Sequence, residues 1–451
     1  MSRPNRLVSL ALIAAPWILH AQTSPDVKMI LDRLDRLERQ NRELADEVHA
    51  LRAELAASRL AQAEAPESAS ETPASVPEQV AIDTQRIDEQ AQTKVEASQH
   101  FPIRLTGMAL FNAFMDSRQS GGSQYPVVAT NPGAGEAGAT LRQTILGLEF
   151  RGPATIGGGK VSGSVYMDFF PSLTGTTQVL RLRTGSIRID WKSRSVMVGI
   201  EKPIFNPREP SSLAQVGVSP LTGAGNLWLW IPQARFEQDF RFGPADGLRA
   251  RFGAVQTQQT NSFISNNPSA TAEAARPGLE GRFEIYHNFD DERRFEFASG
   301  FHTGITHALG ASIPSNLYSF DWFLNPWRHL EFTGAFFSGQ NVASLGAGTR
   351  QGFIINGLTV KPIHATGGWG QLTIRAASRL DFHLFTGQQD YRGSDLLAGD
   401  IGKNLLFGAN FFYHLAPNVI IGPEVSQLRT VYLGQVTRIN NHYDLALAYL
   451  F

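Results

Sequence analysis

Arginine is the residue type in this sequence whose placement predicts chemistry. Five arginines stand in runs where polar and apolar residues alternate, and all five take polar positions: Arg235, Arg249, Arg251, Arg282 and Arg375. A guanidinium group stays charged near neutral pH and can hold a carboxylate or a phosphate through two parallel hydrogen bonds. Acidic residues occupy the same faces: Glu237, Asp239, Glu280, Glu284 and Asp381. The arginines therefore predict either an anion-binding surface or ion pairs that brace the structure.

Motifs that would carry catalysis are missing from the sequence. It contains no G-x-S-x-G, no H-E-x-x-H and no phosphate-binding loop, and its 11 histidines are scattered. It has no cysteine, which excludes disulfides and thiolate metal sites. His302 and His307 are close in sequence, but one falls at a predicted strand end and the other in a loop, so we interpret them as ordinary surface or lumen residues. We expect no enzymatic activity, no metal and no cofactor.

The segments that carry the arginines alternate with a period of two. The pattern begins at residue 101 and recurs to the C-terminus, as in "LRARFGA" (248–254) and "YDLALAYLF" (443–451). Such alternation is typical of β-strands with one apolar and one polar face. Short turns join the segments on one side, and long connections join them on the other: 117–139, 202–226, 257–277, 304–316, 339–367 and 391–402.

Short turns alternating with long loops are typical of an up-and-down β-barrel of an outer membrane. A soluble β-sandwich also alternates, but its outer faces would carry more lysine and glutamate. Aromatic residues mark the ends of the apolar faces, as expected for girdles at the two membrane interfaces: Trp228, Trp230, Trp322, Trp327, Tyr443 and Tyr449. Residues 101–451 are therefore expected to form an all-β transmembrane barrel.

The turns predict about 16 antiparallel strands, and a barrel of that size leaves an aqueous lumen. The expected strands lie near 102–116, 140–151, 160–170, 178–191, 195–204, 227–241, 247–257, 278–289, 295–303, 317–325, 330–338, 368–377, 379–390, 404–415, 418–433 and 437–451. Residues 352–360 could be a loop folded into the lumen or part of another strand pair, so about 14 or 18 strands also fit.

The last strand is expected to pair with the first. An open sheet edge inside a membrane would leave backbone groups without hydrogen bonds. Tyr449 and the terminal Phe451 resemble the C-terminal signature by which bacterial outer-membrane proteins are recognised for assembly. We therefore expect the barrel-assembly machinery to be a partner.

The first 100 residues differ from the rest, since their only aromatic residue is Trp17. Arg3 and Arg6 precede the apolar run 7–19, which predicts a secretory signal peptide over residues 1–21. An uncleaved membrane anchor is the alternative, but a run of 13 residues is short against the roughly 20 that a spanning helix needs.

Residues 22–60 carry an unbroken heptad pattern whose one polar member is Asn41. Its core positions are Val27, Ile30, Leu34, Leu37, Asn41, Leu44, Val48, Leu51 and Leu55. Opposite charges at the flanking positions favour a parallel homo-oligomeric α-helical coiled coil. Asn41 favours two strands, whereas Ile30 favours more. Residues 61–100 are rich in Ala, Pro, Glu and Ser and are expected to form a disordered linker.

The chain resembles the general porins of bacterial outer membranes and, more narrowly, the DcaP-like porins. The narrow resemblance rests on the heptads, on "VGIEKPIF" (198–205) and on "GGWGQL" (367–372), which leads into "RLDFHLFTGQQD". It implies a trimeric barrel behind a periplasmic coiled coil, and passive uptake of small anions, dicarboxylates among them, through an arginine-lined pore. In general porins the loop at the place of 202–226 folds into the lumen. The resemblance therefore implies that Lys202, Arg208 and Glu209 lie at a constriction.

These expectations describe an outer-membrane porin for small hydrophilic solutes, with a mild preference for anions. It would be a lipid-embedded homo-oligomer, a trimer or else a dimer, with its coiled coil in the periplasm of a Gram-negative-type bacterium and no nucleic-acid partner. The alternative is a structural tether, in which the coiled coil reaches toward the cell wall and the barrel only anchors it. A wide lumen is wasteful for an anchor, which could have about eight strands. Either 202–226 or 352–360 could narrow the lumen.

Overall fold

The computed structural model describes residues 103–130, 135–171, 173, 177–256, 277–308, 311–349, 351–356 and 359–451. The predicted signal peptide, the coiled coil with Asn41 and the linker lie outside these residues, so they stay predictions.

Antiparallel β-strands make up most of the described chain. Their bounds are β1 Ile103–Asp116, β2 Glu136–Thr140, β3 Ile145–Thr155, β4 Gly159–Asp168, β5 Arg181–Asp190, β6 Arg194–Glu201, β7 Ile231–Arg241, β8 Asp246–Gln256, β9 Pro277–Asn288, β10 Arg294–Ala308, β11 Ala311–Trp327, β12 Leu330–Gln340, β13 Phe353–Asn356, β14 Thr359–Pro362, β15 His364–Ala377, β16 Leu380–Tyr391, β17 Ile401–Ala416, β18 Val419–Tyr432 and β19 Arg438–Leu450. Three short 3-10 helices accompany them: η1 Ile156–Gly158, η3 Val342–Leu345 and η4 Gly393–Asp395.

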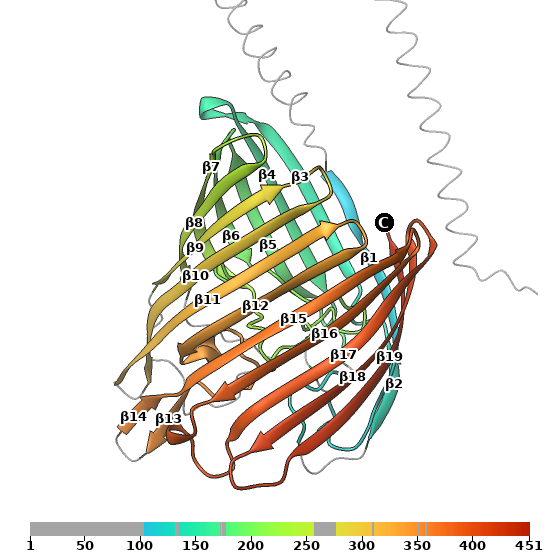
Figure 1. The fold of residues 1–451 in the computed structure, drawn as a ribbon, viewed down its shortest axis with the longest axis vertical. Helices are drawn as coiled ribbons and strands as arrows, with labels where there is room; N and C mark the ends of the chain where they lie inside the picture. Colours follow the sequence, from blue (N-terminus) through green and yellow to red (C-terminus); the bar gives the residue numbers. More distant parts are fainter. Residues whose placement is uncertain are drawn as a thin grey trace, which may run out of the picture. The chain divides into compact units, whose positions relative to one another are not determined.

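The strands form one closed sheet (Figure 1), because β1 pairs with β19 from Met108↔Leu450 to Asp116↔His442. β2 and β3 both pair with β1, on consecutive parts of it, and so form one strand interrupted at residues 141–144. The 17 strands of the sheet therefore make a barrel of 16 strand positions within the described residues. The prediction of about 16 antiparallel strands in a barrel is confirmed. The short turns define one end of the barrel, called here the turn end, and the long connections define the loop end.

The alternation read from the sequence separates an outer from an inner face. On β19, Leu445, Leu447 and Tyr449 face outward and are nearly half exposed, whereas Ala446 and Ala448 face inward and are buried. The same holds around the wall, where outward positions carry large apolar residues such as Phe297 and Phe320. The outer surface is thus apolar and the inner one largely polar.

The structure contradicts the predicted long connection at 304–316 and the predicted girdle role of Trp228 and Trp230. Residues 304–316 are not a loop, because β10 and β11 continue as a ladder to Ala308↔Ala311. Alternation persists through this stretch, with Ile305 outward and exposed and Ile313 buried.

Trp228 and Trp230 do not belong to an outward aromatic girdle, since β7 begins only at Ile231. Trp228 is buried, and the Arg183 guanidinium lies 4.6 Å from the Trp230 ring centre.

The ambiguous segment 352–360 forms a strand pair outside the barrel wall. β13 and β14 pair with each other from Phe353↔Pro362 to Asn356↔Thr359 and make a separate two-stranded sheet. Asp395 of η4 holds this hairpin at the loop end, 2.7 Å from Lys361 Nζ and 2.8 Å from His364 Nδ1. Burial raises the pKa of the Asp395 carboxyl, but hydrogen bonds from Lys361 and His364 outweigh it and lower the pKa below its usual range.

Apolar packing covers part of the inner wall as well. Trp369, Phe385 and Leu406 of β15, β16 and β17 face inward and pack against Leu221 and Ala224 of the connection after β6. A larger cluster combines residues of that connection with η3 and the wall: Ile204, Phe205, Leu227, Leu229, Ile231, Val255, Leu317, Phe337, Val342, Leu345, Ala347, Ile363, Ala365, Tyr391 and Ile401. No helix in the described part of the chain is both long and apolar enough to cross a membrane.

The seam between the first and last strands should be sensitive to added volume at Gly107. A Cβ atom there would lie 2.3 Å from the Ile145 carbonyl oxygen and 2.7 Å from the Phe451 ring. We expect Gly107→Ala to lower the free energy of unfolding by about 1–3 kcal/mol, because the seam must shift to admit the methyl group. Urea unfolding in detergent, followed by the gel shift between folded and heated protein, measures this. Gly243→Ala, where a Cβ would meet nothing within 4 Å, is the control, and equal midpoints for the two variants would contradict the prediction.

Candidate functional site

The connection between β6 and β7, residues 202–230, folds into the interior of the barrel (Figure 1). Ile204, Phe205, Ala214 and Leu221 are each at most 1% exposed. These side chains pack against inward side chains of the wall rather than facing solvent. The hydrogen bonds of this connection end on strands around the whole barrel. We call residues 202–230 the inner loop.

Gln143, at the interruption between β2 and β3, is the principal anchor on one side. Its Oε1 accepts hydrogen bonds from the backbone N–H groups of Val216 and Gly217, at 2.8 and 2.6 Å. Its Nε2 donates to the Ala214 carbonyl at 2.6 Å. The side chain is fully buried, so these bonds satisfy a polar group that water does not reach.

Neutral side chains also anchor the inner loop to β15 and β17. Asn410 of β17 donates to the Ser211 carbonyl at 2.9 Å, and the Ser211 N–H donates to Gln371 Oε1 of β15 at 2.7 Å. Farther along, Asn404 donates to the Gly223 carbonyl at 2.9 Å. Because its anchors lie on β1 to β5 and on β11 to β18, the inner loop crosses the lumen rather than lining one wall.

Arg208 of the inner loop joins an ion-pair network with Arg282 of β9. Arg208 lies 2.5 Å from Asp321, 2.7 Å from Glu296 and 3.6 Å from Glu284. Arg282 lies 2.7 Å from Asp321 and 2.5 Å from Glu284. Two guanidinium groups thus share three carboxylates, with little exposure to water. Such charges can stay ionised away from bulk water because each has several partners.

Most of the site residues predicted from the sequence are paired with carboxylates. Arg249 and Arg251 contact Glu284 and Glu237, and Lys202 lies 2.6 Å from Glu209 within the inner loop. Arg375 stands apart at the turn end, 2.7 Å from Glu331. The structure therefore groups Arg208, Arg249 and Arg282 around Glu284 and leaves Arg375 outside.

Arg235 of β7 differs from the other predicted arginines. It faces the lumen and is partly buried, but it has no carboxylate within salt-bridge distance among the described residues. Its charged neighbours are Arg251, Glu201, Arg188 and Glu237. Arg235 is therefore the lumen arginine among those predicted whose charge is least compensated.

Exposure to water is uneven around the lumen. The side chains of Arg188, Arg249 and Lys202 are 35%, 27% and 37% exposed. Inward residues of the opposite wall, such as Asn404 and Glu424, are buried beneath the inner loop and the connection after β1. Water within the barrel consequently has most access on the side of β5, β7 and β8.

Several side chains that hold the inner loop were not singled out from the sequence. Gln143 and Asn112 anchor it on one side, and Asp168 fixes Arg181 and Arg183, which donate to the Gly217 and Val216 carbonyls. The alternation places Asn112 and Asp168 inward, but it does not reveal their partners. In the part of the chain that the structure describes, no three histidine or acidic groups are arranged to hold a metal ion.

Comparisons with solved structures show the fold. The chain is similar to the outer membrane channel DcaP of Acinetobacter baumannii, with a TM-score of 0.64 and 16% sequence identity over 77% of this chain and 97% of that one. It is also similar to an anion-selective porin from Comamonas acidovorans, with a TM-score of 0.52 and 11% identity over 77% of this chain and 99% of that one. No family model and no curated protein matches the sequence. The barrel therefore has the porin fold.

The ion-pair network around Arg208 should contribute to stability. Arg208→Ala leaves Glu296 and Asp321 with fewer partners in a largely buried place, so we expect a loss of about 3 kcal/mol in the free energy of unfolding. Lys202→Ala is the control, because its pair with Glu209 is more exposed and should contribute less than about 1 kcal/mol. Urea unfolding in detergent measures both. An equal loss in the free energy of unfolding for the two variants would contradict a stabilising role of the Arg208 network.

Proposed function

We propose that this chain is an outer-membrane porin, through which small hydrophilic solutes diffuse passively. The observation that carries the proposal is the inner loop, which is fastened to opposite walls inside a closed barrel with an apolar outer surface. A barrel that only anchored another domain would have no need of a polar interior narrowed by a braced loop. The similarity to the DcaP channel and to a porin supports the same function.

The solute path is proposed to run between the inner loop and the wall of β5, β7 and β8. The partly exposed charged residues gather there, whereas the wall of β15 to β18 is covered by packed residues. In this proposal Lys202 and Glu209 face the path from the inner loop. Arg249 and Arg251 face it from β8.

We further propose a mild preference for anions, small carboxylates among them. Selectivity in a water-filled pore depends on the charges around its narrowest part. Most of the inward arginines are neutralised by carboxylates, so the preference would come mainly from Arg235, with Arg188 and Arg251 near it. The Comamonas acidovorans structure with the same fold is an anion-selective porin, which is consistent with this proposal.

The proposed assembly is a homo-oligomer, most simply a trimer, in the outer membrane. Residues 1–21 would be the signal peptide, and the coiled coil over 22–60 would lie in the periplasm, joined to the barrel by the 61–100 linker. Tyr449 and Phe451 would serve as the signal for the barrel-assembly machinery. The structural tether remains the rival function, and conductance separates the two, because a barrel that serves only as an anchor gives no stable channels.

Removing part of the inner loop should widen the pore. Deleting residues 208–218 takes away the segment held by Gln143, Gln371 and Asn410, and we expect the single-channel conductance in planar bilayers to rise. The gel shift of the folded barrel shows whether the variant has assembled. An assembled variant with unchanged conductance would rule out this loop as the constriction.

Selectivity should depend on Arg235. We expect Arg235→Gln to shift the reversal potential across a potassium chloride gradient toward cations, because a lumen charge without a counter-ion is lost. Arg249→Ala and Arg251→Ala should shift it in the same direction by adding unpaired carboxylates to the path. Arg194→Gln, at the exposed start of β6, is the control and should leave the potential unchanged. Cation selectivity in the unmodified protein would contradict the proposal.

A further inference from the structure

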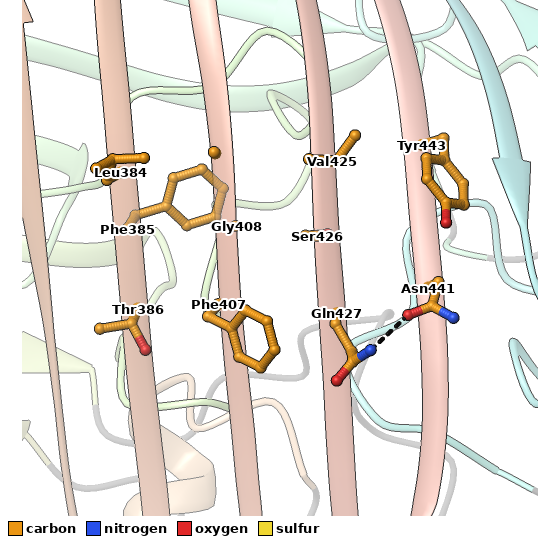
Figure 2. Close-up of a pocket in the computed structure, with 11 residues that line it drawn as sticks. Leu384, Phe385, Thr386, Phe407, Gly408, Val425, Ser426, Gln427, Asn441 and Tyr443 are labelled. Carbon is orange, nitrogen blue, oxygen red and sulfur yellow. Dashed lines mark hydrogen bonds between the residues drawn. The ribbon is translucent and has the colours of Figure 1, made fainter.

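A hollow on the outer face of the barrel has no role in the proposed transport. It crosses β16, β17, β18 and β19 and has a volume of about 620 Å³ (Figure 2). Its lining includes outward residues that are among the more exposed apolar ones of the wall: Leu384, Phe407, Val425 and Tyr443. The depression arises because Ala409 stands between the larger Leu384 and Val425, its partners on the neighbouring strands.

The edge of this hollow nearer the loop end is polar. Gln427 of β18 donates to Asn441 Oδ1 of β19 at 2.7 Å (Figure 2), so a hydrogen bond joins two amides on a largely apolar surface. Arg429 donates from Nε to Gln427 Oε1 at 2.6 Å. Its guanidinium carbon lies 5.3 Å from the centre of the Phe407 ring, which lines the hollow. The cation is therefore held at the edge of the apolar depression.

Arg429 is exposed and forms no ion pair with a carboxylate in the described part of the chain. The inward arginines around Glu284 show the opposite arrangement, since carboxylates surround them. One amide and one aromatic ring fix the direction of Arg429, but neither neutralises its charge. What the site lacks is an anion, and a guanidinium group suits a phosphate, which it can hold through two hydrogen bonds.

The level of Arg429 along the barrel indicates where that anion would come from. Arg429 lies three residues before the end of β18 at Tyr432, on the loop side of the hollow. This step rests on the proposed function, because the long connections of an outer-membrane barrel face the outside of the cell. Arg429 would then lie at the headgroups of the outer leaflet and the hollow beside its acyl chains.

We propose that the hollow binds a phosphorylated lipid of the outer leaflet. One acyl chain lies over Ala409 between Leu384 and Val425, and the phosphate contacts Arg429. Tyr443 and Phe407 flank the chain, and the Gln427–Asn441 pair separates it from the headgroup. Charge complementarity selects this occupant over a neutral lipid, because an unpaired cation stands directly above an apolar depression.

Native mass spectrometry of the full-length protein, released from phosphatidylcholine nanodiscs, tests the proposal. One set of discs contains lipid A with both phosphates, and the matched set contains lipid A from which both phosphates have been removed. We expect the unmodified protein to retain the phosphorylated form about five- to tenfold more. Arg429→Gln should abolish that difference. Ala409→Phe fills the hollow and should reduce retention of both forms.

Two substitutions away from the hollow serve as controls. Arg241→Gln removes an exposed arginine that is paired with Asp239 at the turn end of β7, and Ala234→Phe enlarges a small outward residue on the same strand. Both should retain lipid as the unmodified protein does. Equal retention of the two lipids by the unmodified protein, or unchanged retention by Arg429→Gln, would overturn the proposal. A loss of oligomer in Ala409→Phe without a change in lipid retention would show instead that the hollow contacts a second copy.

Conductance keeps this proposal separate from the proposed function. Arg429→Gln and Ala409→Phe change only the outer face, so both should conduct as the unmodified protein does. An unmodified protein that retains lipid A but gives no channels would refute the porin function and leave the lipid site standing.

Discussion

Closure of the sheet is the constraint on which the rest of this structure depends. Pairing of β1 with β19 joins the first and last strands of the barrel, so the sheet closes without an open edge between them. It also brings the two ends of the barrel domain together, with Phe451 exchanging backbone hydrogen bonds with Gly107. Once the wall is closed, each side chain faces either outward or inward. The period-two alternation of the sequence then becomes an apolar outer surface and a polar interior.

A polar interior needs partners, and the inner loop supplies many of them. Gln143, Gln371, Asn404 and Asn410 would be costly to bury alone, but each bonds to the backbone of that loop or of the connection after β1. The fixed loop divides the lumen into two unlike sides. One is filled by packed apolar residues such as Trp369 and Phe385, and the other keeps partly exposed arginines. The division explains why a wide barrel leaves only part of its cross-section to water.

The local sequence pattern predicted most of the fold but few of the contacts within the site. The alternation in "YDLALAYLF" suffices to place Tyr449 outward and Ala448 inward, because strand geometry is a property of neighbouring residues. The same reasoning failed at Trp228 and Trp230. Their alternation continues that of β7, yet both belong to the inner loop, whose packing partners are remote in sequence. It also missed Gln143, since a glutamine at a strand interruption resembles any surface residue until Val216 and Gly217 meet it. The sequence identified Arg208 and Arg282 as candidate site residues, but it could not show that both contact Asp321, because that depends on tertiary contacts.

The inner loop is fastened by neutral amides and by ion pairs, and the ion pairs of Arg208 have little exposure to water. Dissolved salt weakens attraction between charges that water can reach, but it screens buried pairs much less and hardly affects amide hydrogen bonds. Within the loop, the pair of Lys202 and Glu209 is more exposed than the pairs of Arg208. A rising ionic strength therefore weakens the Lys202–Glu209 pair first, while Gln143 and Arg208 keep the loop in its place across the lumen.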